Sequence, residues 1–182
     1  MATGLTDLDG VHAAVAEGAD LVRVADPVLV TAARVAYPQL GVCTPAGAAA
    51  GWAAGRSAVA GRSAVAGDPG VALICALSEV DSVLAAGADP ARILVELDPG
   101  PDFARRLADL VATGWPVLVS DWELPGTSAQ IQAGALAGTA IAAWLGARVF
   151  GARQVRATRR VLTMVAAIRG DIPPASATRG LA

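Results

Sequence analysis

The feature that most constrains this chain is an alternation between short apolar runs of strand length and longer segments with helical spacing. Such alternation is typical of repeated strand–helix units and predicts an α/β fold with a parallel sheet. The predicted strands are 20–25, 40–44, 71–76, 92–97, 116–120 and 147–150. A chain of 182 residues is long enough for one well-packed domain, which we expect to span 1–170.

Helices are predicted after these strands. Ser78 followed by Asp81 resembles a capping sequence, and Gly87 supplies the stop for that helix. Residues 102–113 and 155–168 each place apolar side chains on one face at helical spacing. The residues expected to face inward are Phe103, Leu107, Leu110 and Val111 in the first, and Val155, Thr158, Leu162, Val165 and Ile168 in the second.

The composition excludes several kinds of site. All 14 positive charges are arginine, and lysine and asparagine are absent, so no lysine can form a Schiff base or act as a tuned base. The net charge is -2, and the arginines are dispersed except for Arg105-Arg106 and a run of five between 148 and 160, so the composition does not indicate a nucleic-acid partner. Cys43 and Cys75 lie in apolar runs apart from the single His12, so we expect neither a metal site nor a disulfide, and no cofactor.

The mean hydropathy of +0.53 raises the question of a membrane segment. Residues 124–147 carry no charge, but proline, serine, glutamine and many small residues make them too weakly apolar for a convincing span. The first ten residues lack the basic and apolar regions of a signal peptide. We therefore expect a cytoplasmic protein with no membrane partner.

A six-residue unit, Ala-Gly-Arg-Ser-Ala-Val, occurs twice, at 54–59 and 60–65. The simplest interpretation is a duplicated, irregular loop over 54–68. The alternative is a phosphate cradle, in which Arg56 and Arg62 would assist the backbone, but no Gly-Lys-Ser/Thr ending supports it. Residues 171–182 predict an irregular tail.

Residues 93–103 carry a recognisable motif, Asp98-Pro99-Gly100 with Phe103 three positions on. This pattern resembles the Asp-Pro-Gly-x-x-Phe motif of the dihydropteroate synthase family, and the helix and strand that follow agree in order. The stretches 146–166 and 179–182 are similar to the second, divergent synthase-like copy that some bacteria carry.

The resemblance implies a (βα)8 TIM-type barrel whose ligands bind at the carboxyl ends of the strands. This chain is shorter than such barrels, its first strand–helix unit is not recognisable, and the repeat stands in place of the fourth. We therefore expect an incomplete or irregular barrel of about six parallel strands. Its open edges must close irregularly or pair with another chain, as a homo-oligomer or with a different protein.

The family joins para-aminobenzoate to a pterin while diphosphate leaves. The positions that the resemblance carries over to substrate binding are Asp98, Gly100, Phe103, Ser120 and Arg153. Other family positions have changed: Asp121 follows Ser120 where a lysine is expected, and Cys43 replaces an acid. Because several preorganised groups are lost together, we predict no catalytic residue.

Each retained residue also has a purely structural interpretation. Asp98 could form a tight turn and cap the next helix, Phe103 could belong to the core, and Arg153 could lie on a solvated helix face. Three functions therefore stay open. The first is a catalytically inactive binding or assembly module. The second is residual pterin-dependent transfer through Asp98, Ser120 and Arg153, and the third is a fragment of a longer gene product.

Overall fold

A computed structural model describes residues 1, 5–46, 71–120 and 127–173. It contains one parallel sheet whose strands follow chain order from β1 to β6. The strands are β1 (Leu21–Arg23), β2 (Gly41–Pro45), β3 (Val71–Cys75), β4 (Ile93–Leu97), β5 (Val117–Val119) and β6 (Val149–Phe150). All six predicted strands are confirmed, as is the α/β class.

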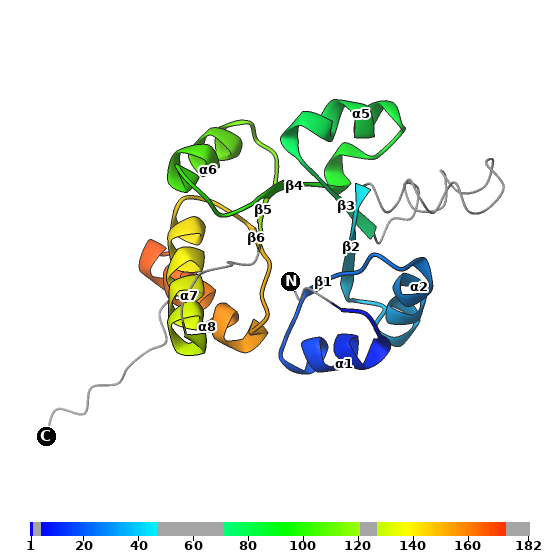
Figure 1. The fold of residues 1–182 in the computed structure, drawn as a ribbon, viewed down its shortest axis with the longest axis horizontal. Helices are drawn as coiled ribbons and strands as arrows, with labels where there is room; N and C mark the ends of the chain where they lie inside the picture. The colour runs from blue at the N-terminus through cyan, green and yellow to red at the C-terminus, as the bar shows by residue number, and fades with distance from the viewer. Residues whose placement is uncertain (2–4, 47–70, 121–126, 174–182) are drawn as a thin grey trace, which may run out of the picture.

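Helices surround the curled sheet, as Figure 1 shows in a view down the shortest axis of the molecule. They are α1 (Leu8–Ala16), α2 (Pro27–Ala36), α5 (Val80–Ala85), α6 (Phe103–Ala112), α7 (Ser128–Trp144) and α8 (Val155–Arg169), with 3-10 turns at Leu77–Glu79 and Pro90–Arg92. The architecture is the incomplete TIM-type barrel that the sequence predicts.

Side chains alternate between the two faces of each strand, so the core has an inner and an outer part. The inner part fills the lumen of the curl, with Cys43, Ile74 and Leu118 buried at its centre. The outer part packs β3 to β6 against α5, α6 and α7, where Ile93 and Leu107 are fully buried. A second outer cluster packs α1 and α2 on β1 and β2.

The first residue and the start of α8 contact the two edge strands, β6 and β1. The Met1 main-chain nitrogen donates to the Phe150 carbonyl at 2.9 Å, and the Ala152 N–H donates to the Met1 carbonyl at 2.9 Å. Val155, at the start of α8, belongs to the cluster that covers β1. The sheet keeps β1 and β6 as its two edges, so the choice between irregular closure and pairing with another chain stays a prediction.

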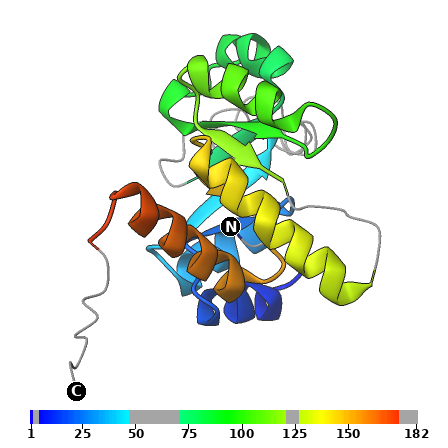
Figure 2. The same ribbon diagram turned by 90° about the vertical axis from the view of Figure 1, so that its left-hand side faces the viewer.

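Helix α7 and helix α8 lie side by side (Figure 2). Near their first turns Gln132 Nε2 donates to Gln154 Oε1, and near their last turns Arg169 NH1 donates to the Ala143 carbonyl at 2.9 Å. The two helices are therefore held together at both ends.

Two local predictions are wrong. Ser78 and Asp81 do not cap a helix after β3. A 3-10 turn comes first, and there the Glu79 carboxylate accepts a hydrogen bond from the Ala76 N–H at 2.9 Å. Ile168 does not face inward: its side chain is 65% exposed, and in Figure 2 the end of α8 extends away from the sheet.

Several predictions lie outside the described residues. These concern the repeat and the loop over 54–68, the position of Asp121, and the tail beyond residue 173. The proposed domain limit at residue 170 stays a prediction.

Candidate functional site at the carboxyl ends of the strands

Polar side chains enter the lumen near the carboxyl ends of the strands. In β1 and β4 the outward residues Val22 and Val95 are buried under helices, so the neighbouring Arg23 and Glu96 point into the lumen. Ser120, directly after β5, is on the same inner face because Val119 faces outward. Three different strands thus contribute to one polar cluster.

The three side chains form a connected network. The Ser120 hydroxyl donates to Glu96 Oε1 at 2.7 Å. Arg23 NH1 donates to the same oxygen, and Arg23 NH2 lies 3.5 Å from Glu96 Oε2. The arginine and glutamate side chains are 30% and 22% exposed, so the pair is largely shielded from solvent. Arg23 and Glu96 lie on strands that are not neighbours, and their ion pair therefore spans the lumen.

Three of the predicted substrate-binding residues follow adjacent strands. Asp98 follows β4, Ser120 follows β5, and Arg153 follows β6. The Ser120 N–H donates to the Leu97 carbonyl at 3.2 Å, which places Ser120 beside the residue before Asp98. Parallel strands bring their carboxyl ends to one edge, so the structure gathers these three positions along that edge.

Asp98 is exposed, and its carboxylate has no hydrogen bond or ion pair in the described part of the chain. Its carbonyl lies 3.5 Å from Arg106 NH1. The N-cap of α6 is Asp102, in the left-handed region at φ 53°, and not Asp98. The capping interpretation of Asp98 is therefore wrong, and its carboxylate is available to accept hydrogen bonds from a ligand.

The other predicted residues take different positions. Gly100 is exposed, and a Cβ atom there would lie 3.5 Å from Arg106 NH1, an ordinary contact, so packing does not require glycine. Phe103 is 9% exposed and packs in the outer core cluster. Its core interpretation is confirmed. Arg153 is exposed on the loop that leads into α8.

Cys43, which stands where the family resemblance leads us to expect an acid, is fully buried in the lumen. Its thiol lies 3.3 Å from the Val22 carbonyl and 3.0 Å from the Met1 sulfur. Burial, the largest effect, raises the pKa of Cys43 to about 12. The thiol is neutral at physiological pH and cannot replace a carboxylate as an anionic ligand.

Arg23 and Glu96 were missed in the sequence. The available signal was their strand alternation: a charged residue lies between two buried valines at 22 and 24, and another between buried Val95 and Leu97. A charge at such a position must face the lumen, because helices cover the outer face of the curled sheet. Nothing in the sequence, however, indicates that these two charges meet.

In the described ranges, no group of three or more His, Cys, Asp or Glu side chains is arranged to hold a metal ion. None of the helices described combines the length and hydropathy needed to cross a bilayer.

Comparison with known proteins adds to this geometry. Over 115 residues the chain is 44% identical to "Inactive dihydropteroate synthase 2" of Mycobacterium tuberculosis, a match that covers 54% of this chain and 36% of that protein. Over nearly its whole length it is similar to the solved structure of Mycobacterium tuberculosis Rv1207, with 32% identity and a TM-score of 0.65, covering 96% of this chain and 94% of the other. The chain is a divergent dihydropteroate synthase-like protein.

The chain differs in sequence from the dihydropteroate synthases and matches only part of the curated relatives. It spans little more than a third of the length of the curated relatives it matches, and no family model matches it. A dihydropteroate synthase from Coxiella burnetii, solved in complex with pteroic acid, shares the fold at 17% identity with a TM-score of 0.62, covering 91% of this chain and 86% of the other. The fold of the dihydropteroate synthases is thus retained with much of the sequence changed.

Proposed function

We propose that this chain is a catalytically inactive dihydropteroate synthase homologue that acts as a binding or assembly module. The observation that carries the proposal is the closed network of Arg23, Glu96 and Ser120 in the lumen. The arginine is paired with the glutamate, and the serine hydroxyl donates to the same carboxylate. The name of the curated relatives, which are called inactive, supports this view.

Transfer with loss of diphosphate requires cations and donors that are free to meet developing negative charge. In the lumen the charge of Arg23 is neutralised by Glu96, and Cys43 is a buried neutral thiol. The chain has no lysine or asparagine to supply the missing groups. The loss of one preorganised donor typically costs about 10²–10³ in rate, and several are absent here.

An exposed apolar face on α7 and α8 supports an assembly role. Its large side chains are Ile141 and Trp144 on α7, exposed by 54% and 56%, and Met164 and Ile168 on α8, exposed by 51% and 65%. We refer to these four residues as the α7–α8 face. Large exposed apolar patches typically mark interaction sites.

A second copy of this chain is the partner we favour. A two-fold interface places the same surface against itself, so a face with uncompensated charge would repel its copy. The charges next to the α7–α8 face compensate each other, because Arg169 Nε lies 3.2 Å from Asp171 Oδ2. The Arg169 bond to the Ala143 carbonyl also holds the two helices in a fixed relation before assembly.

Light scattering during size-exclusion chromatography tests this assembly. We expect a mass of twice 18.1 kDa for the unaltered chain, and 18.1 kDa for a variant with Trp144→Arg and Ile168→Arg. Val35→Arg is the matched control, because Val35 is 78% exposed on α2, away from the face. A chain that elutes as a monomer, or a dimer that survives both face substitutions, would refute the homodimer. If the chain is a monomer, the same measurement on its mixture with an active synthase distinguishes pairing with that enzyme from no assembly.

Pterin binding without turnover is a second candidate function. It is favoured by the Asp98 carboxylate, which has no partner among the described residues and lies at the edge that Ser120 and Arg153 share. Calorimetric titration with pteroic acid, the ligand of the Coxiella synthase, tests it. We expect heat for the unaltered chain and for the control Asp109→Ala on α6, and its loss in Asp98→Ala. No heat at millimolar ligand, or equal heat in both variants, would exclude a pterin role for Asp98.

A further inference from the structure

A groove in the helical layer lies between the end of α1 and the first turns of α8. One hollow of about 380 Å³ is lined by Glu17, Gly18, Arg156, Arg159, Arg160 and Thr163. An adjoining hollow of about 400 Å³ is lined by Glu17, Gln154, Arg156, Ala157 and Arg160. The two share three residues, so we treat them as one α1–α8 groove. Hollows of this size suit small-molecule ligands.

This groove is separate from the lumen site. Its lining comes from α8, its preceding loop, and the turn that leads into β1. Asp98 and Ser120 instead follow the carboxyl ends of β4 and β5. The Arg23–Glu96 pair lies inside the curl, whereas the groove lies between two helices that cover its outside (Figure 1).

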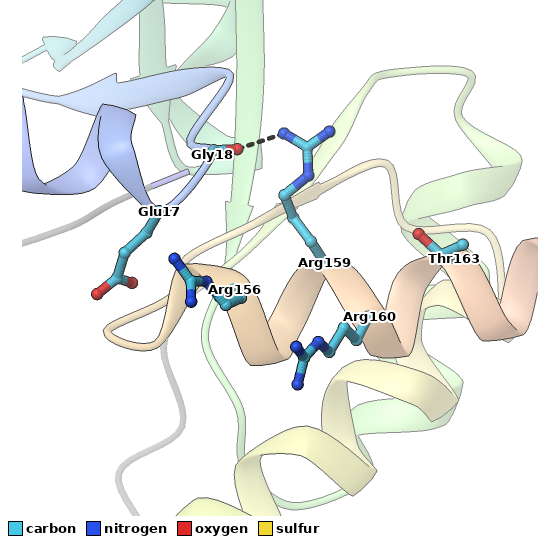
Figure 3. Close-up of a pocket in the computed structure, with 6 residues that line it drawn as sticks. All are labelled: Glu17, Gly18, Arg156, Arg159, Arg160 and Thr163. Atoms are coloured by element: carbon cyan, nitrogen blue, oxygen red, sulfur yellow. Dashed lines mark hydrogen bonds between the residues drawn. The ribbon is translucent and has the colours of Figure 1, made fainter.

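The three arginines of the groove differ in their contacts. Arg159 NH1 donates to the Gly18 carbonyl and to Asp20 Oδ1 and Oδ2, the latter two at 3.0 and 3.1 Å. Figure 3 shows Arg159 reaching Gly18, while Arg156 and Arg160 extend in other directions from α8. Arg156 and Arg160 have no hydrogen bond or ion pair within the described residues. Arg159 thus fixes the wall of the groove, and the other two guanidinium groups are available.

The placement of Arg156 and Arg160 is unfavourable for α8 itself. Like charges four residues apart on a helix repel each other, and a cation in the first turn opposes the helix dipole. Helix α8 contains no acidic residue that could compensate. Glu17, the one acidic lining residue, makes no ion pair with either arginine in the described structure. A bound anion would remove this repulsion.

We propose that the α1–α8 groove binds a ligand bearing a phosphate group. Two guanidinium groups one helical turn apart supply forked donors that match phosphate oxygens, and their combined charge matches a phosphate dianion. Thr163 and Gln154 add neutral hydrogen-bonding groups to the lining. The proposal does not depend on the function proposed for the lumen or on assembly.

Binding of inorganic phosphate, measured by calorimetry against chloride at equal ionic strength, tests the proposal. We expect Arg156→Gln and Arg160→Gln each to weaken binding about tenfold or more, because each removes charge-assisted hydrogen bonds. Glutamine preserves helix propensity, so both variants should fold. Arg105→Gln is the control, since Arg105 is exposed on α6 and pairs with Asp102 at 3.0 Å.

Thermal unfolding supplies a second readout. Phosphate should raise the melting temperature of the unaltered chain and of Arg105→Gln, and the increase should disappear in the double variant Arg156→Gln/Arg160→Gln. Titration with glycerol 3-phosphate and with phosphatidic acid vesicles distinguishes a soluble ligand from a lipid headgroup. Absence of phosphate binding, or equal binding by the double variant and the unaltered chain, would overturn the proposal.

Discussion

Replacing Glu96 with leucine tests the lumen network directly. The substitution removes the carboxylate that accepts from both Ser120 and Arg23, and leaves the Arg23 guanidinium in a lumen where its side chain is only 30% exposed. The neighbouring lumen residues Ile74 and Leu118 are apolar and buried, so they cannot replace the lost acceptor. We expect the folded state to be destabilised.

The magnitude follows from the contacts. Hydrogen bonds to a charged group contribute about 1.5–3 kcal/mol, and the partial exposure of both side chains places the expected loss near the lower end, at about 1–2 kcal/mol. For a chain of this length that loss lowers the melting temperature by about 2–8 °C. Arg23→Met should cost a similar amount. The double variant Glu96→Leu/Arg23→Met should lose less stability than the two single losses added together, by at least about 0.5 kcal/mol. The reason is that it leaves no unpaired charge in the lumen.

Urea denaturation followed by circular dichroism measures these free energies of unfolding. The control is Arg105→Gln, which breaks an ion pair whose side chains are 75% and 67% exposed and should change stability by well under 1 kcal/mol. If the losses of Glu96→Leu and Arg23→Met simply add in the double variant, the ion pair across the lumen does not exist in solution and the reasoning fails.

Three further predictions concern single positions. Burial raises the pKa of Cys43 to about 12 from the ordinary 9.0, so the contribution of Cys43 to the free energy of unfolding should be constant below pH 9 and be lost as the pH rises toward 12. Cys43→Ala should flatten the fall of stability over this range in urea titrations, and an unchanged slope would contradict the argument. Gly146→Ala should lower the free energy of unfolding by more than about 1 kcal/mol, because Gly146 has φ +104° and an added Cβ would lie 3.3 Å from Val111. Gly100→Ala should cost much less, so equal melting temperatures for the two variants would refute the argument. Leu118→Ala, at a fully buried lumen position, should cost about 2–5 kcal/mol in the same denaturation assay.

The strands could be predicted because each is a short apolar run bounded by turn residues. Val71–Cys75 and Ile93–Leu97 match their predicted ranges within one residue at each end. The inner face of α6 also followed from helical spacing, since Phe103, Leu107 and Leu110 are buried as expected. These features depend on local periodicity, which the sequence records directly.

Features that depend on contacts between distant residues could not be predicted in this way. The Arg23–Glu96 pair joins positions 73 residues apart, and its formation depends on how tightly the sheet curls. The hydrogen bond of Met1 to Phe150 depends on the position of β6 relative to the first residue of the chain. Ile168 fits the apolar spacing of α8 but lies beyond the surface that would bury it.

The same distinction applies to the site. The family resemblance placed Asp98 and Ser120 at strand ends, and they directly follow β4 and β5, because strand ends can be located from sequence. It did not show that Ser120 donates to Glu96, or that the Asp98 carboxylate remains unpaired in the described structure. Side-chain partners decide whether an inherited residue can still bind a ligand, and only the folded arrangement reveals them.

The most direct test of the central claim is an assay of the purified chain for 7,8-dihydropteroate, with para-aminobenzoate and the pterin diphosphate as substrates and an active synthase as the positive control. A lumen in which Glu96 neutralises Arg23 predicts no product above the blank without protein. Formation of 7,8-dihydropteroate at a rate comparable to the control enzyme would contradict the account.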